Sequence, residues 1–314
     1  MSSIEQLFAD HRKFLWSLSY RMTGSAADAD DVVQDTFVRA MEHPPRRMED
    51  PLRPWLVKVA LNLSRDVLRR RKRREYVGPW LPSPIETTDE PPSHEPAIDG
   101  MRALEGRYDL LESVSFAFLL ALERLTPRQR AVLLLRGVFD YSVKETADAL
   151  DLSEASVKTT HHRARAVMAA YDGSRQRPTA ALQQATHAAL LAFMQRLEAR
   201  DVAGIEALLA EDVKTTTDGG GDYQAALRTI VGRAKVIRFY VAVALPSAEV
   251  EGDFVMLNGL PSVAARVPGA TGRAAPRFAM TLELDREGKI SHIYVVSANR
   301  KLTALPHRTP GTIR

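Results

Sequence analysis

The stretch from Ser142 to Met168 constrains the fold more than any other part of the chain, because it predicts two short helices joined by a tight turn. Apolar residues recur at helical spacing on both sides of Asp151, and Ser153 is a good N-cap for a second helix. This arrangement is typical of a helix-turn-helix, whose second helix enters the major groove of DNA. The exposed side of that helix is expected to carry Ser156, Lys158, Thr159, His162, Arg163 and Arg165.

The composition limits the classes of protein to which the chain can belong. Its 314 residues predict two or three compact units. The net charge is only +4, but basic residues are concentrated in the run from Arg69 to Arg74. The absence of cysteine excludes disulfides, zinc fingers and thiol nucleophiles. No apolar run is long enough to cross a bilayer, so we expect a soluble cytoplasmic protein without membrane contact.

Residues 1–74 are expected to form a first domain of three helices. The second of these helices, which ends near Met41, is predicted to bury Val33, Phe37 and Met41. Another of its faces carries three carboxylates, which belong to Asp28, Asp31 and Asp35. Charge that complements a helix start explains Asp28 but not Asp35. An acidic face cannot favour DNA, so a basic protein partner is the sharper interpretation.

The third helix of this domain is predicted to start at Pro54 and to lead into the basic run. One side of it is apolar and is expected to bury Leu56, Val59, Leu63 and Val67. The other side presents polar residues at steps of four, three and four positions: Lys58, Asn62, Arg65 and Arg69. Because Asn hydrogen-bonds base edges and Arg binds phosphates, this stripe predicts a second surface that faces DNA.

The rest of the chain is expected to contain a linker and two further domains. Residues 75–112 are rich in proline and acidic residues, yet Trp80 and Leu81 form an apolar patch that predicts docking onto a neighbour. Residues 113–173 are expected to form a helical domain that contains the helix-turn-helix. Residues 178–305 are expected to be an α+β domain, with a hairpin of strands at 278–284 and 290–296. The predicted class is therefore mainly α, followed by α+β.

The sequence also offers candidates for catalysis, all of them in the α+β domain. The available polar residues there are Asp212, Asp218, Tyr223 and His292. Catalysis would require a buried acid or base beside an oxyanion donor, and spacing alone does not place two of these residues around a pocket. His161 and His162 are adjacent on a helix and lack partners at metal-ligand spacing. We therefore expect no catalytic residue, metal or cofactor.

Three motifs carry a resemblance to a known family. They are ADADDVVQDTFVRA at 27–40, PWLVKVALNLSRDVLRRRKRR at 54–74 and LTPRQRAVLLLRGVFDYSVKETADALDLSEASVKTTHHRARAVM at 125–168. Together they resemble the two domains of bacterial sigma factors of the extracytoplasmic-function (ECF) group. The resemblance covers roughly the first 170 residues. It implies core RNA polymerase, through its β′ and β subunits, and promoter DNA as partners.

The resemblance also implies roles for individual residues. The first motif, with its acidic face, would dock on the polymerase β′ clamp helices through Asp30, Asp31, Val32, Gln34, Asp35 and Phe37. The second would lie at the −10 promoter element and capture a flipped base there, with Trp55, Lys58, Asn62, Arg65, Asp66 and Arg69 on the DNA side. The helix from Glu154 would read the −35 element. Asp151 is a departure, because the family usually has Gly in that turn, and Asp tolerates left-handed geometry better than most residues.

The C-terminal domain resembles that of an ECF subgroup with a fused, cone-shaped SnoaL-like domain. The similar stretches are YVGPWLPSP at 76–84, TTDGGGDY at 216–223 and SANRKL at 297–302. Asp222 replaces the usual Lys, and the last stretch lacks a Pro. The hypothesis is that this domain folds back on the helical domains and sets how far apart the DNA-reading surfaces lie. The expected interdomain contacts are Trp80, Leu81, Gly219, Gly220 and Gly221.

Two other functions remain open at this point. The chain could be a small-molecule-binding or enzymatic SnoaL-like protein with a helical interaction module, although regulation is favoured over catalysis because fold analogy is a weak argument for activity. It could also be a repressor that binds DNA without polymerase, but a repressor needs neither the acidic helix nor the −10-type motif. The sequence leaves open the promoter sequence, any separate anti-sigma protein and any ligand of the last domain.

Overall fold

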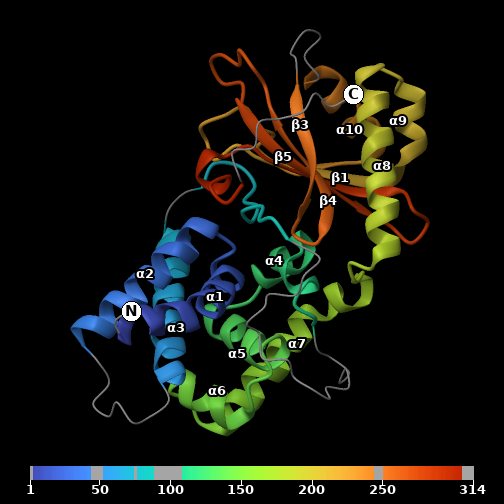
Figure 1. Cartoon of the computed structure of the whole chain (residues 1–314). Coiled ribbons are helices and arrows are strands. Elements are labelled where there is room, and N and C mark those ends of the chain that lie inside the picture. Colours follow the sequence, from blue (N-terminus) through green and yellow to red (C-terminus); the bar gives the residue numbers. More distant parts are fainter. Residues whose placement is uncertain (1–2, 44–51, 74–75, 88–107, 244–249, 306–314) are drawn as a thin grey trace. The chain divides into compact units, whose positions relative to one another are not determined.

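The computed structural model describes residues 3–43, 52–73, 76–87, 108–243 and 250–305 (Figure 1). The chain divides into two compact units, and each is described by itself. The N-terminal unit contains residues 1–75 and 88–176, and the C-terminal unit contains residues 76–87 and 177–314. The predicted class, mainly helical followed by α+β, is confirmed. Most of the linker and Arg74 lie outside the described residues.

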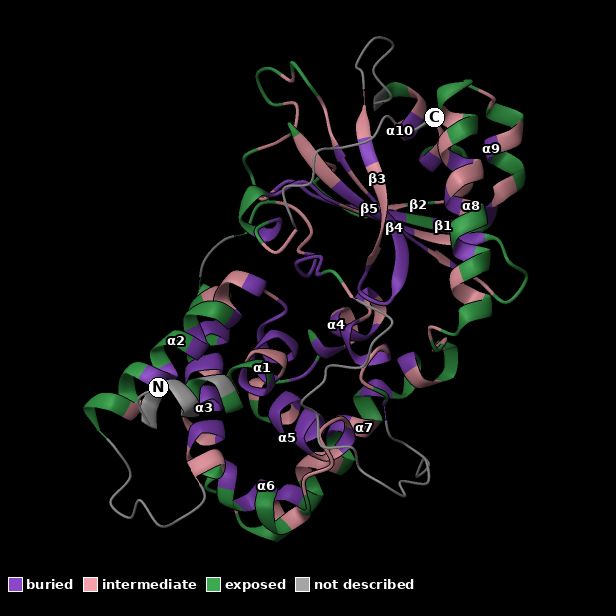
Figure 2. Cartoon of the chain, in the orientation of Figure 1, coloured by how far each residue is buried: buried purple, intermediate pink, exposed green. Residues whose placement is uncertain are grey.

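The N-terminal unit begins with three helices that pack on one another (Figure 1). They are α1 (Ser3–Thr23), α2 (Ala26–Glu42) and α3 (Leu52–Arg73). Gly24 has a positive φ of 68°, which lets the chain turn sharply after α1. Ser25 then caps α2 by accepting a hydrogen bond from the Asp28 backbone N–H at 3.2 Å. Figure 2 shows the buried side of each helix facing the middle of this bundle.

Among its described residues, the second part of the N-terminal unit has a short 3-10 turn (Glu112–Val114) and four α-helices. These are α4 (Phe116–Leu122), α5 (Pro127–Gly137), α6 (Val143–Leu150) and α7 (Glu154–Ser174). Capping boxes start α5 at Thr126 and α6 at Ser142. Asp151 ends α6 in the left-handed conformation, with φ 53° and ψ 51°, and Ser153 caps α7. The predicted helix-turn-helix is therefore present as α6 and α7.

The C-terminal unit is a six-stranded sheet with helices. The helices are α8 (Ala180–Glu198), α9 (Val202–Leu208) and α10 (Arg233–Val243). The strands are β1 (Leu209–Asp218), β2 (Ile230–Val231), β3 (Glu251–Leu257), β4 (Leu260–Arg266), β5 (Arg277–Leu284) and β6 (Ile290–Val296). Their order is β2-β1-β6-β5-β4-β3, and only the β1–β6 pair is parallel among the described pairs. The predicted hairpin of β5 and β6 is confirmed.

One side of this sheet and the three helices enclose the core of the C-terminal unit. Phe193 of α8, Val236 of α10, and Val263, Leu282 and Ile293 of the sheet are fully buried in it. Strand residues alternate between this core and the other face, as the two-residue period of a β-strand requires. Asp218, the last residue of β1, therefore lies on the face away from the apolar core. Thr216 of β1 and His292 of β6 lie on the same face.

Residues 76–87 belong to the C-terminal unit although they precede the helix-turn-helix in the sequence. The Ile85 N–H donates to Asn258 Oδ1 at 3.0 Å, and the Asn258 N–H donates back to the Ile85 carbonyl at 3.0 Å. The Thr87 N–H donates to the Met256 carbonyl at 2.9 Å. This segment is therefore bound to the end of β3 and to the turn that follows it.

Two expectations about helix packing are wrong. Met41 was expected in the buried stripe of α2, but it is 53% exposed. Val59 is only partly buried, whereas Leu56, Leu63 and Val67 are buried as expected. Met41 lies in the last turn of α2, beyond the part of the helix that faces the other two. Periodicity identifies the face of a helix but not the point at which its neighbours end.

Candidate DNA- and polymerase-binding surfaces

The recognition helix α7 presents a row of polar side chains to solvent. Lys158, Thr159, His162 and Arg163 are exposed, while Val157, Ala164 and Met168 are buried against the rest of the domain. Arg165 differs from the expected exposed pattern. Its guanidinium donates to the Tyr108 hydroxyl at 2.8 Å and forms a 3.2 Å ion pair with Asp172.

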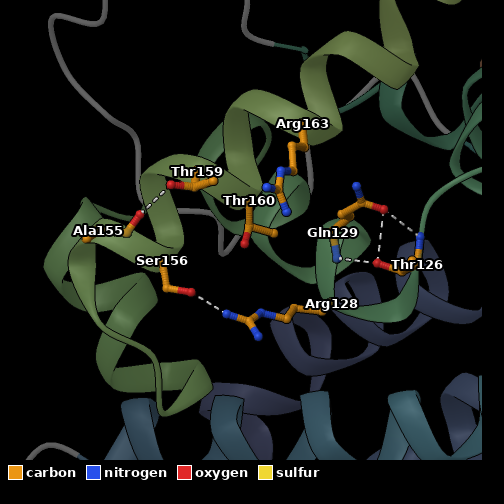
Figure 3. Close-up of a pocket in the computed structure, with 8 residues that line it drawn as sticks. All are labelled: Thr126, Arg128, Gln129, Ala155, Ser156, Thr159, Thr160 and Arg163. Carbon is orange, nitrogen blue, oxygen red and sulfur yellow. Dashed lines mark hydrogen bonds between the residues drawn. The ribbon is translucent and has the colours of Figure 1, made fainter.

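A hollow of about 560 Å³ lies between the start of α5 and the recognition helix (Figure 3). Arg128 of α5 and Arg163 of α7 line it together with hydroxyl groups. Arg128 donates a hydrogen bond to the Ser156 hydroxyl, which holds its guanidinium beside the start of α7. A hollow with two guanidinium groups and hydroxyl donors suits a phosphate group. The residues that line it are Thr126, Arg128, Gln129, Ala155, Ser156, Thr159, Thr160 and Arg163.

Arg128 was missed by the sequence analysis, although a signal for it was present. Thr126 followed by Pro127 is a typical helix start, which places Arg128 in the first turn of a helix, and Arg128 is exposed there. Sequence alone could not show that this residue reaches Ser156, 28 positions later. The contact depends on how α5 packs against α7.

The stripe predicted on α3 is present, but several of its members bind other protein groups. Lys58 Nζ lies 2.6 Å from Asp151 Oδ1 in the turn of the helix-turn-helix. Arg69 pairs with Asp66 at 2.8 Å. Arg65 Nη1 lies 3.4 Å from Asn62 Oδ1. Asn62, Asp66 and Arg69 are exposed, whereas Trp55, Lys58 and Arg65 are partly buried.

The predicted polymerase-binding residues on α2 divide into two sets. Asp30, Asp31, Gln34 and Asp35 are exposed, and Trp16 Nε1 donates to Asp30 Oδ1 at 3.0 Å. Val32 and Phe37 are 2% and 5% exposed, so they support the helix from inside instead of reaching a partner. Partial burial, and then repulsion from Asp28, Asp35 and Asp30, raises the pKa of Asp31. The acidic face therefore has a concentrated negative potential that a basic surface would relieve.

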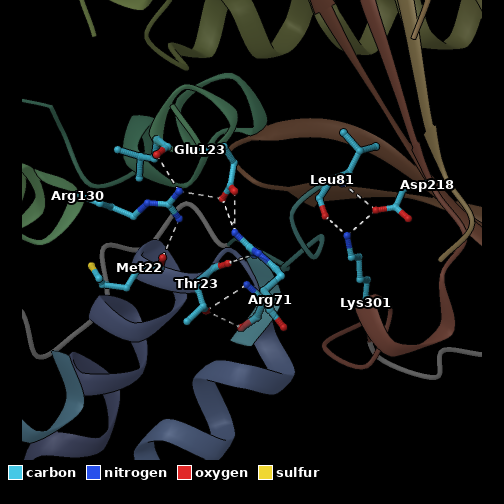
Figure 4. Close-up of polar contacts among 10 residues, drawn as sticks. Met22, Thr23, Arg71, Leu81, Glu123, Arg130, Asp218 and Lys301 are labelled. Atoms are coloured by element: carbon cyan, nitrogen blue, oxygen red, sulfur yellow. Dashed lines mark hydrogen bonds and ion pairs between the residues drawn. The ribbon is translucent and has the colours of Figure 1, made fainter. Parts of the chain in front are cut away.

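In the C-terminal unit, Asp218 and Lys301 form a buried ion pair that binds the segment 76–87 (Figure 4). Asp218 accepts hydrogen bonds from the Leu81 N–H at 2.8 Å and from the Tyr76 hydroxyl at 2.6 Å. Lys301 also donates to the Leu81 carbonyl, and its ammonium lies 4.3 Å from the centre of the Trp80 ring. We call Asp218, Lys301 and their partners in this segment the linker anchor.

The glycine loop after β1 completes the linker anchor. The Gly220 N–H donates to Asp218 Oδ1 at 3.0 Å, and a Cβ at this position would lie 2.8 Å from the Ala298 Cβ. Gly221 lies against Val77, and Gly219 is buried beside Tyr223. Trp80, Leu81 and the three glycines were predicted as contacts between the C-terminal domain and the helical domains, but in the structure the contacts described here lie within the C-terminal unit. The role of Lys301 was not predicted from the sequence, although the stretch at 297–302 that contains it was noted for its resemblance.

Three of the four residues considered for catalysis, Asp218, Tyr223 and His292, bind other protein groups. Asp218 belongs to the linker anchor, and the Tyr223 hydroxyl accepts a hydrogen bond from Asn299 at 2.6 Å. Asp212 is exposed. His292 Nε2 and the Thr216 hydroxyl are 2.9 Å apart, and burial, assisted by the nearby Lys214 charge, lowers the pKa of His292 to about 3. His292 is therefore neutral at physiological pH.

Among the residues that the structure describes, no group of three or more His, Asp or Glu side chains is placed to hold a metal ion. None of the helices within the described ranges combines the length and the apolar character that are needed to cross a membrane.

Comparison with known proteins identifies the family. The chain matches the family models for sigma-70 region 2 over residues 7–74 and sigma-70 region 4 over residues 115–168. It is 31% identical to the ECF RNA polymerase sigma factor SigJ of Mycobacterium tuberculosis over 301 residues, which cover 94% of this chain and 92% of that protein. A shorter match, 37% identical over 175 residues, is to SigG of the same organism and covers 49% of this chain and 45% of that protein.

A solved structure supports the same relationship. The crystal structure of the Mycobacterium tuberculosis SigJ protein superimposes with a TM-score of 0.67 and 27% identity, over 98% of this chain and 100% of that one. The match extends through both units, so the C-terminal sheet is part of the relationship as well as the helices. The chain therefore belongs to the extracytoplasmic-function group of RNA polymerase sigma factors.

Proposed function

We propose that the chain directs core RNA polymerase to promoters by reading two DNA elements. In this proposal α7 contacts the −35 element, α3 contacts the −10 element and the acidic face of α2 binds the polymerase. The protein would act in the cytoplasm, where both partners are found. The observation that carries the proposal is the capped helix-turn-helix, whose exposed side combines Lys158, His162 and Arg163 with Arg128 from the neighbouring helix.

The residues around the hollow support a division of labour at the −35 element. Arg128 and Arg163 lie on its two sides, where guanidinium groups would bind the DNA backbone or a base edge. Arg165 is held by Tyr108 and Asp172, so it would have to exchange these partners before it could contact DNA. We therefore place Arg163 and Arg128 ahead of Arg165 in the interface.

The exposed carboxylates of α2 support a polymerase-binding role. Asp31 and Asp35 lie on the same helix face, and the raised pKa of Asp31 reflects burial and the repulsion among its neighbours. A basic partner surface would remove that repulsion, so binding gains more from Asp31 than from an isolated carboxylate. Val32 and Phe37 would contribute by holding the helix in place.

We further propose that the C-terminal unit modulates promoter recognition by holding the linker, and we assign no catalytic step to it. The linker anchor fixes Leu81 through both its N–H and its carbonyl. The anchored residues 76–87 lie between the −10-facing and −35-facing parts of the sequence, so anchoring shortens the chain that can span the two DNA elements. The occupied partners of Asp218 favour this structural role over a catalytic one.

Reconstituted transcription tests the main proposal. Run-off transcription with purified core polymerase should require the full chain, and Arg163→Ala should lower promoter affinity about tenfold or more. Arg238→Ala, which removes an exposed arginine from α10, is the matched control and should change little. Transcription that does not depend on the added chain would contradict the proposal and would favour a small-molecule-binding protein instead.

A second pair of variants tests the polymerase-binding face. Asp31→Ala should weaken binding to core polymerase in a pull-down while leaving promoter DNA affinity unchanged. Asp212→Ala removes an exposed carboxylate from the C-terminal unit and serves as its control. Equal polymerase binding by both variants would exclude Asp31 from the interface.

A further inference from the structure

The two parts of the N-terminal unit that are proposed to bind different promoter elements are joined by a bridge of charges (Figure 4). Arg71 of α3 donates to both carboxylate oxygens of Glu123 at 2.7 Å. Arg130 of α5 donates to Glu123 Oε1 at 3.0 Å. Glu123, which follows α4, therefore connects a guanidinium of the −10-facing part with one of the −35-facing part.

The same two guanidiniums also bind the C-terminal end of α1. Arg71 donates to the Thr23 carbonyl at 2.7 Å, and Arg130 donates to the Met22 carbonyl at 2.8 Å. These carbonyls carry the negative end of the helix dipole. Arg130 is only 2% exposed, and a buried charge of this kind requires its partners. Glu123 is thus the carboxylate that pairs with both guanidiniums at the interface between the two parts, which we call the seam.

A second contact involves the turn of the helix-turn-helix. Asp151, between α6 and α7, is the partner of Lys58 on α3 at 2.6 Å. Lys58 is one of the residues proposed to face the −10 element. In this arrangement its ammonium group is paired with a carboxylate from the turn of the helix-turn-helix, so it is not available to a DNA phosphate.

The seam also contains an apolar contact and a third arginine that binds groups of the second part. The rings of Phe14 and Phe139 meet edge to face with centroids 5.2 Å apart. Arg21 of α1 donates to the Ser113 hydroxyl at 2.7 Å and to the Leu110 carbonyl at 2.9 Å. The seam is therefore a packed interface, with the Glu123 bridge and the Lys58–Asp151 pair at its edges.

This closed arrangement cannot read both promoter elements at once. The −10 and −35 elements lie roughly 25 base pairs apart, which at about 3.4 Å per step is on the order of 85 Å along B-DNA. A compact unit of this size spans only about 40 Å. In this arrangement the turn before α7 touches α3. The two surfaces must therefore separate before they can engage their elements together.

We infer that Glu123 and Asp151 form an intramolecular latch that holds the free sigma factor closed and competes with promoter DNA for its cationic side chains. Opening requires Arg71 and Lys58 to exchange these carboxylates for other anions, and DNA phosphates are the anions that the proposed function supplies. The inference rests on that proposed function for its biological meaning. The existence of the latch itself can be tested in the free chain.

The decisive measurement is the distance between the two parts in the free, full-length chain. The chain has no cysteine, so Glu42→Cys on α2 and Lys144→Cys on α6 can be spin-labelled without other changes. Double electron–electron resonance should give one short distance for this background. Adding Glu123→Gln should move a large share of the population to longer distances, and an unchanged distribution in a folded variant would overturn the latch.

Binding to a promoter duplex without polymerase gives the second readout. We expect Glu123→Gln to bind about tenfold more tightly than the parent chain, because the closed state no longer competes. Asp151→Asn keeps a residue that tolerates the left-handed turn and should tighten binding about two- to threefold. Asp148→Asn removes one exposed carboxylate from the same helix and is the matched control for charge alone.

The outcomes separate the latch from the proposed function. If Glu123→Gln fails to fold by circular dichroism, Asp151→Asn decides the question by itself. Equal affinities for Asp151→Asn and Asp148→Asn would overturn the latch. A shift in distances without any transcription by the parent chain would retain the latch and refute the sigma-factor function.

Discussion

The two units of the protein each contain a basic residue that joins separate segments through a carboxylate, but the two junctions differ in depth. In the linker anchor, the side chains of Lys301 and Asp218 are 8% and 0% exposed. In the bridge at the helical seam, the side chains of Arg71 and Glu123 are 21% and 31% exposed. The side chain of Arg130, the second partner of Glu123, is 3% exposed, but it also donates to the Met22 and Leu122 carbonyls. A buried pair cannot lose one partner without leaving an uncompensated charge, whereas a partly exposed pair can exchange its partner for water or another anion. The comparison predicts a permanent junction in the C-terminal unit and a reversible one in the helices.

The largest expected effect is that of breaking the linker anchor. Lys301→Met should lower the free energy of unfolding of the C-terminal unit by about 3–5 kcal/mol, because it leaves the Asp218 carboxylate buried without its cation. Urea denaturation followed by circular dichroism measures this loss. Lys235→Met, at an exposed position of α10, is the control. A loss as small as that of the control would show that the anchor is as replaceable as the helical bridge.

Lowering the pH should destabilise the C-terminal unit, which contains the linker anchor, because His292 is buried there in its neutral form. The pKa of His292 is lowered to about 3 in the folded protein, so the folded state binds fewer protons than the unfolded chain below pH 6.5. The contribution of His292 to the free energy of unfolding is fully present above pH 6.5. About 1.4 kcal/mol of it is lost per pH unit as the pH falls toward 3. Thermal unfolding between pH 7 and pH 5 should show this slope, and His292→Gln should remove it. His187→Gln, an exposed histidine of α8, should retain it.

A smaller effect should come from the loop that supports Asp218. Gly220→Ala introduces a Cβ at φ +64° that would lie 2.8 Å from Ala298. Gly288→Ala, at φ +77°, has nothing within 4 Å, so it measures backbone strain alone. Strain should cost about 1 kcal/mol at either position, and the clash should add about 1–3 kcal/mol at Gly220 only. Equal melting temperatures for the two variants would show that the loop yields easily and that the anchor is less rigid than its burial implies.

The smallest change in stability should come from breaking the Lys58–Asp151 pair at the helical seam, which is predicted to be reversible. Asp151→Asn removes an ion pair whose side chains are 38% and 68% exposed, so the free energy of unfolding should change by less than about 1 kcal/mol. Equilibrium unfolding in urea measures this change beside that of Lys301→Met. A loss comparable with the Lys301 variant would show that the seam is not built to open.

Much of the helical half was predictable from local patterns. The Ser25, Thr126 and Ser153 helix starts follow from capping chemistry that depends on a few neighbouring residues, and all three are present. The exposed positions of Lys158 and Arg163 followed from the helical period. Arg165 and Met41 departed from expectation because their surroundings depend on Tyr108 and on where the neighbouring helices end.

The linker shows the opposite case. Its prolines excluded a helix, and the Trp80–Leu81 patch predicted that it docks onto a neighbour. The sequence pattern could not show which surface it docks onto. Asp218 and Lys301 lie 137 and 220 positions from Leu81. A charged pair that is distant in sequence gives no periodic signal, and Asp218 was therefore grouped with candidates for catalysis.

The sequence by itself determined the order of the elements, the helix-turn-helix and the cationic and acidic helix faces, because these depend on spacing and capping within a single helix. Only the tertiary structure decided which charges meet. Burial settles that question, since a charge removed from water must find a partner wherever the packed chain brings one near. For this reason the buried Asp218 holds a linker instead of a substrate, whereas the more exposed Arg71 and Lys58 find their partners through the way α3 packs beside the helices that follow.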